Sequence, residues 1–70
     1  MYHRPEPKFR KGEIVFSKDD MMSGTILSFK LRSYYVMDRP IKIIEEFRYE
    51  ILMDSEVKYF LEPDLKRIKE

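Results

Sequence analysis

The chain has 70 residues, of which 43% are hydrophobic and 39% charged, so it has room for one domain near the lower size limit of a self-supporting core and is too apolar to be disordered. It contains no cysteine, which excludes disulfides, thiolate metal sites and thiol catalysis. Its net charge of +1 gives little long-range attraction for a phosphate backbone, which disfavours strong non-specific binding of nucleic acids.

Residues 1–8 contain two prolines and no apolar periodicity, which predicts a flexible N-terminal arm ahead of a domain over residues 9–70. The segment up to residue 12 is locally basic, and it is either a solvated tail or a binding device. No apolar run approaches the roughly 18 residues that span a bilayer, and the charged N-terminal segment is unlike a signal peptide. We therefore expect a cytoplasmic protein that does not enter a membrane.

The first strand is predicted at residues 14–16, where β-branched and aromatic residues follow a turn signal at residues 11–13. Residues 17–23 are expected to form a loop, because the charged residues Lys18, Asp19 and Asp20 are poor strand formers. Gly24 then opens the second strand, and a glycine at that place commonly marks a bulge or a close approach of the backbone.

Two long stretches rich in strand formers, residues 25–38 and 41–54, lie on either side of Arg39-Pro40. Because the proline interrupts the pattern, they predict one long antiparallel hairpin that closes there. Closure between residues 39 and 40 would pair Tyr35 with Ile44, Val36 with Ile43, and Ile26 with Met53.

A short helix over residues 41–47 is the alternative for the start of the second stretch, since Ile43, Ile44 and Phe47 have helical spacing. The strand is favoured for three reasons. The segment lacks an N-cap, is short for an isolated helix, and continues into a strand-like alternation at residues 49–51.

The C-terminal part predicts a second hairpin and then a single-turn stop. Polar residues 54–56 form its turn and residues 57–61 the fourth strand. Pro63 fixes its own φ and has no N–H for a ladder, so residues 62–64 predict a 3₁₀ turn before a last strand at residues 65–68. Five sequential strands without a crossover helix favour an antiparallel meander. The expected interior is Val15, Ile26, Ile51, Met53, Phe60, Leu65 and Ile68, with Ile14 and Tyr49 at its margins.

Four short motifs between residues 9 and 68 resemble the SH3-like superfamily, which includes KOW and Tudor domains. They are Lys11-Gly12-Glu13-Ile14-Val15, Gly24-Thr25-Ile26, Tyr49-Glu50-Ile51 and Tyr59-Phe60-Leu61-Glu62-Pro63-Asp64-Leu65. The resemblance implies an all-β fold, a five-stranded SH3-like antiparallel barrel. The hairpin between its second and third strands is extended, and a 3₁₀ turn precedes the last strand.

Catalytic and metal-binding chemistry find little support in this sequence. The single histidine, His3, lies in the predicted arm, and there is no nucleophile elbow or glycine-rich phosphate loop. Acidic neighbours occur at Asp19-Asp20 and Glu45-Glu46, but neighbouring residues of a strand point to opposite faces. We expect no enzymatic activity, no metal site and no cofactor.

The long hairpin carries the candidate functional site. Its apolar residues exceed what a small barrel covers and are rimmed by charge, which indicates a protein partner or self-association. The alternative is binding of RNA or single-stranded DNA, because strand alternation puts Lys30, Arg32 and Tyr34 on one face. A purely structural interpretation also stands, in which the aromatic residues pack on the barrel and the basic ones pair with glutamates across strands. The candidate partner-binding residues are Met21, Met22, Lys30, Arg32, Tyr34, Tyr35, Met37, Arg39, Ile41 and Ile43.

Overall fold

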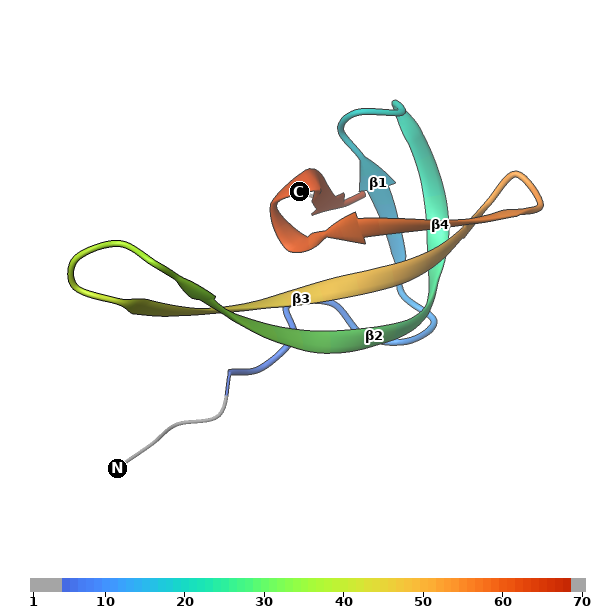
Figure 1. The fold of residues 1–70 in the computed structure, drawn as a ribbon. Coiled ribbons are helices and arrows are strands. Elements are labelled where there is room, and N and C mark those ends of the chain that lie inside the picture. Colours follow the sequence, from blue (N-terminus) through green and yellow to red (C-terminus); the bar gives the residue numbers. More distant parts are fainter. Residues whose placement is uncertain (1–4, 69–70) are drawn as a thin grey trace.

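The computed structural model describes residues 5–68 and shows five strands and one 3₁₀ helix (Figure 1). The elements are β1 (Ile14–Ser17), β2 (Met22–Val36), β3 (Lys42–Met53), β4 (Glu56–Leu61), η1 (Glu62–Asp64) and β5 (Leu65–Arg67). All neighbouring strands pair antiparallel. The all-β class, the five strands and the 3₁₀ turn at residue 63 are therefore confirmed, and residues 41–47 lead into a strand rather than a helix. No helix within residues 5–68 has the length and apolar character needed to cross a membrane.

The strands form a single sheet in the order β4-β3-β2-β1-β5. Within residues 5–68 no strand pairing joins β4 to β5, so the sheet is open between its two edge strands. β2 curves strongly, so that its first part pairs with β1 and its longer second part pairs with β3 (Figure 1). Gly24 pairs with Val15 of β1, just before the residues of β2 that pair with β3, and a Cβ atom there would stand 2.6 Å from Cγ2 of Ile51. The predicted close approach of the backbone is therefore present.

The β2–β3 hairpin closes half a residue earlier than predicted, which shifts each cross-strand partner near the turn by one residue. Its turn occupies residues 37–41, an odd number centred on Arg39, and so Tyr35 pairs with Ile43. A further shift between Ile26 and Ser28 interrupts the ladder, and Ile26 pairs with Ile51. The predicted pairs were Tyr35 with Ile44, Val36 with Ile43, and Ile26 with Met53, and all three are wrong.

The core lies on the concave side of the sheet and contains five of the predicted interior residues. These are Val15, Ile26, Ile51, Met53 and Leu65, while Phe60 packs against them partly buried. Ile68 was predicted inside but is 53% exposed, because β5 ends at the preceding residue. Ile14 is exposed because β1 turns Val15 and Ser17 inward.

An aromatic cluster, which the sequence did not predict, fills the centre of the core. Tyr49 was expected at the margin, yet it is fully buried, and its ring centroid lies 5.5 Å from that of Phe9 in an edge-to-face arrangement. Phe29 and Phe47 extend the cluster along β2 and β3, with their ring centroids 5.9 Å apart. The cluster therefore holds both the segment before β1 and the base of the β2–β3 hairpin on one core.

Candidate functional site

The part of the β2–β3 hairpin beyond the other strands is here called the distal hairpin, residues 28–47. β1 pairs with β2 only as far as Thr25, and β4 pairs with β3 only from Arg48 onward. Within the described chain, no strand therefore flanks residues 28–36 or residues 42–47 on the side away from their hairpin partner. Figure 1 shows this ribbon projecting from the body of the molecule.

One face of the distal hairpin, the apolar face, continues the core outward. Cross-strand pairs of this face are Leu31 with Phe47, Ser33 with Glu45, and Tyr35 with Ile43, and at its base Phe29 pairs with Tyr49, just beyond the distal hairpin. Exposure rises along the face, from 8% at Phe47 to 69% at Tyr35 and 64% at Ile43. The residues of the turn add the exposed side chains of Met37 and Ile41. Towards the turn, the apolar side chains of Tyr35 and Ile43 are thus held in a paired ribbon outside the core.

The opposite face, the basic face, carries most of the hairpin's positive charge. Its residues are Lys30, Arg32, Tyr34 and Val36 of β2 with Lys42, Ile44, Glu46 and Arg48 of β3. The guanidinium of Arg48 lies 5.0 Å from the ring centroid of Tyr59 on β4. A shallow hollow of about 130 Å³ opens beside this pair, and its other lining residues are Ser28, Phe29, Lys30 and Glu50.

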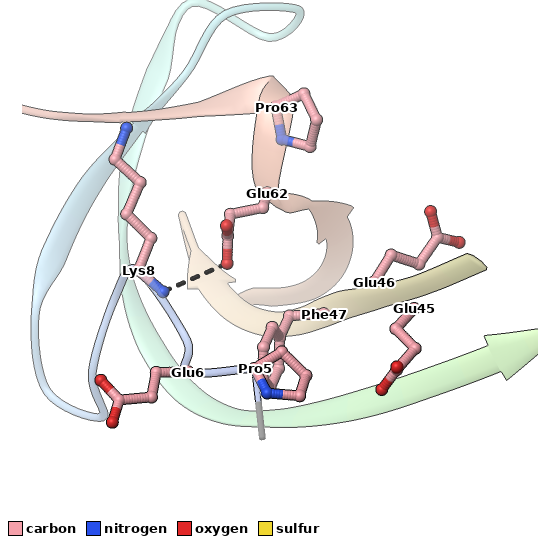
Figure 2. Close-up of a pocket in the computed structure, with 8 residues that line it drawn as sticks. All are labelled: Pro5, Glu6, Lys8, Glu45, Glu46, Phe47, Glu62 and Pro63. Atoms are coloured by element: carbon pink, nitrogen blue, oxygen red, sulfur yellow. Dashed lines mark hydrogen bonds between the residues drawn. The ribbon is translucent and has the colours of Figure 1, made fainter. Parts of the chain in front are cut away.

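A larger hollow of about 380 Å³, here called the edge hollow, lies where β4 leaves the side of β3. It is lined by Pro5, Glu6, Lys8, Glu45, Glu46, Phe47, Glu62 and Pro63. Pro5 and Phe47 both line the hollow. The backbone N–H of Lys8 donates a 3.2 Å hydrogen bond to the Glu62 carboxylate, which is dashed in Figure 2. The hollow combines an apolar lining from two prolines and a phenylalanine with four glutamates and one lysine.

A hydrogen-bond network anchors the wall of the edge hollow. Glu62 also accepts a 2.6 Å hydrogen bond from the hydroxyl of Tyr49, and that hydroxyl accepts one from the backbone N–H of Phe9 at 3.3 Å. Burial raises the pKa of Tyr49 well above its usual range, and the bond to Glu62 adds to the effect. Tyr49 therefore stays protonated and acts as a structural donor.

The structure divides the predicted partner-binding residues into separate groups. Lys30, Arg32 and Tyr34 share the basic face, as strand alternation predicted. Two others, Tyr35 and Ile43, lie opposite each other on the apolar face. The turn of the distal hairpin contains Met37, Arg39 and Ile41.

Two predicted residues lie elsewhere. Met21 ends the β1–β2 loop, and Met22 begins β2 and packs partly buried against the core. Both are therefore at the opposite end of β2 from the distal hairpin.

Three residues beside the site were not predicted. Tyr59 joins the basic face because the β3–β4 register sets it opposite Glu50. Lys42 and Glu46 share that face. Strand alternation could have predicted this, because residues four apart along one strand point to the same side of the sheet. Only the register shows which neighbours they meet.

Asp20, one of the acidic neighbours considered above for catalysis and metal binding, has a different contact. Asp20 forms a 3.0 Å ion pair with Lys58, which raises the pKa of that lysine. No three His, Cys, Asp or Glu side chains among residues 5–68 are grouped so as to hold a metal ion. His3, the single histidine of the chain, lies outside the described residues.

Comparisons of the chain with protein-family models, with curated proteins and with solved structures found no match. The chemistry of the distal hairpin is therefore the basis for assigning its role.

Proposed function

We propose that this chain is a small non-enzymatic binding module of the SH3-like kind, and that its distal hairpin binds another protein. The 3₁₀ turn between the last two strands supports the SH3-like relationship. The binding role rests on one observation, the pairing of Tyr35 with Ile43 outside the core, where both are about two-thirds exposed. Covering a large apolar side chain contributes about 1.5–3 kcal/mol, so a partner that covers both gains substantially.

The strand edges of the distal hairpin add backbone hydrogen bonding to this proposed binding. An edge strand presents backbone N–H and C=O groups that an incoming strand can pair with. Main-chain pairing supplies affinity, and the alternating side chains of the two faces supply selectivity. The apolar and basic faces therefore select different side chains on the same incoming strand.

Site-specific photocrosslinking tests the protein-binding role. Benzoylphenylalanine is placed at position 35 or 43 of the full chain, in cells that express it. The matched control is position 57, because Val57 is also exposed but lies on β4, away from the distal hairpin. We expect covalent protein adducts at positions 35 and 43 only, whether the adduct contains a second copy or another protein. Absence of protein adducts at both positions contradicts the proposal.

The basic face favours a second candidate function, binding of single-stranded nucleic acid. Arg48 stacked on the exposed ring of Tyr59, with Lys30 adjacent, combines cations with an aromatic platform. Stacking contributes about 1–3 kcal/mol per base, and phosphate contacts weaken as salt rises. Fluorescence anisotropy with a labelled single strand at low salt tests this role. Binding that Tyr59→Ala removes and Tyr35→Ser preserves supports it, and no binding at low salt eliminates it.

A further inference from the structure

The outer edge of β3, which faces away from β2, carries the charge pattern that most restricts what the distal hairpin can pair with. Over residues 42–47 no other strand of the described chain lies along it, since β4 begins to pair only at Arg48. This short edge carries both signs of charge, with Lys42 near its start and Glu46 near its end. Such an edge is able to complement itself when a second strand runs antiparallel.

The register of self-pairing is restricted by geometry. Residues opposite each other in an antiparallel ladder share a face of the sheet. The two-fold axis that relates two identical paired strands must therefore lie midway between one residue and its own copy, and we name each register by that residue. Centring the axis on Glu45 would set that carboxylate against its own copy, and centring it on Ile43 forms no charge pair. An axis through Ile44 sets Lys42 of each chain opposite Glu46 of the other, giving two opposite-charge pairs on the basic face.

The other edge of the distal hairpin lacks this complementarity. Residues 28–36 of β2 carry two charges, Lys30 and Arg32, and both are positive. No antiparallel self-pairing of this edge forms an opposite-charge pair, and an axis through Arg32 sets two guanidinium groups against each other.

We propose that the protein bound by the distal hairpin is a second copy of this chain, paired through residues 42–46 of β3 about a two-fold axis at Ile44. This inference rests on the protein-binding function proposed above. Two hairpins then form one continuous four-stranded ribbon, in the order β2-β3 of one chain and β3-β2 of its partner. The interface is isologous, so each contact occurs twice.

The same register brings the turn of each hairpin to the edge hollow of the other. In this register Ile41, which is exposed in the single chain, falls opposite Phe47 of the other chain, and Figure 2 shows Phe47 among the residues that line the hollow. Arg39 of that turn and Lys42 at the start of β3 approach a hollow whose glutamates are Glu6, Glu45, Glu46 and Glu62. Apolar character and charge thus agree at the place where β4 leaves β3.

Charge-swap sedimentation tests the dimer on the purified full chain. We expect the wild-type chain to sediment as a monomer–dimer equilibrium. Lys42→Glu alone and Glu46→Lys alone each turn two attractive pairs into repulsive ones and weaken the dimer by about tenfold or more. A 1:1 mixture of the two variants, and the double variant K42E/E46K, restore dimerisation because opposite charges meet again.

Two controls keep the result specific. Lys30→Glu reverses a charge on the same face but on β2, and we expect it to leave the dimer unchanged. Glu46 lies opposite Arg32 within the chain, so circular dichroism checks that Glu46→Lys is folded, and Lys42→Glu gives the result independently. A monomeric wild-type chain, or a dimer that tolerates Lys42→Glu, overturns the proposal.

Failure of the dimer is distinguishable from failure of the binding function. A monomeric chain that still crosslinks at positions 35 and 43 to a different protein overturns the second-copy proposal and leaves the binding function standing. A monomeric chain without protein adducts at those positions overturns both.

Discussion

The hydroxyl of Tyr49 donates a 2.6 Å hydrogen bond to Oε2 of Glu62, joining the middle of β3 to the 3₁₀ turn. The same carboxylate oxygen accepts the N–H of Lys8, and the same hydroxyl accepts the N–H of Phe9. One phenol and one carboxylate therefore tie three segments together at the root of the distal hairpin. The stability of the domain should depend on this link more than on any surface ion pair.

Replacing Tyr49 with phenylalanine should lower the free energy of unfolding by about 1–3 kcal/mol. The variant keeps the ring but leaves the buried N–H of Phe9 without its acceptor. Urea denaturation measures the loss. Tyr59→Phe is the matched control, because Tyr59 is exposed and its ring remains under Arg48, so its effect should stay within about 0.5 kcal/mol. Equal effects of the two substitutions would show that the Tyr49 hydroxyl is not a structural donor.

The raised pKa of Tyr49 predicts a loss of stability in alkaline solution. Below the ordinary tyrosine pKa of about 10, both the folded and the unfolded chain keep the proton, and the contribution is complete. Above that pH the unfolded chain releases the proton while the folded chain holds it, so stability falls as pH rises. The difference in unfolding free energy between wild type and Tyr49→Phe should therefore narrow from pH about 9 to about 11. A difference that stays constant over this range would contradict the prediction.

Two residues on the same face of β3 should differ sharply in their importance for folding. Phe47 is buried in the aromatic cluster, and Phe47→Ala should cost about 3–5 kcal/mol of unfolding free energy. Ile43, four residues earlier, is exposed, and Ile43→Ala should change it by no more than about 0.5 kcal/mol. Thermal unfolding measures both variants. The protein concentration is kept as low as the signal allows, so that self-association of the chain does not contribute to the measured stability. A large cost at Ile43 would mean that the distal hairpin serves the fold rather than a partner.

The two glycines should resist substitution for different reasons. A Cβ at Gly24 would lie 2.6 Å from Ile51 and Met53 side-chain atoms and 2.7 Å from the carbonyl oxygen of Leu52, so Gly24→Ala should cost about 1–3 kcal/mol and disturb core packing. Gly12 has open space around it but a φ of +84°, so Gly12→Ala should cost about 1–2 kcal/mol through the backbone alone.

Near-UV circular dichroism separates these two effects. We expect a changed aromatic signal for Gly24→Ala and an unchanged one for Gly12→Ala. A Gly24→Ala variant with wild-type stability and spectrum would refute the close packing of β2 on β3.

Local chemistry accounts for the parts of the fold that the sequence predicted. Pro63 stops a strand whatever surrounds it, and the alternation of apolar residues assigns Val15, Ile26 and Ile51 to the interior. The hairpin register was wrong because it depends on whether the turn holds an odd or even number of residues and on the shift after Ile26. Neither is encoded in a strand-forming pattern.

The faces of the distal hairpin could be predicted from the sequence, but the edge hollow could not. Alternation alone placed Lys30, Arg32 and Tyr34 on one face of the hairpin. The edge hollow was not predictable, because it forms where residues 5–8, β3 and η1 meet, and these segments are far apart in the sequence. Phe9 was also missed, since its burial depends on the Tyr49 ring and hydroxyl.

The positive charges on the free edge of β2 also set a limit to assembly. When two chains join through β3, the outer edges of the resulting ribbon are both β2, and each carries Lys30 and Arg32 without an acidic residue. A second dimer that approached either edge through its own β2 would bring cations toward cations. If the proposed dimer forms, its two outer edges therefore disfavour further growth through β2–β2 contacts.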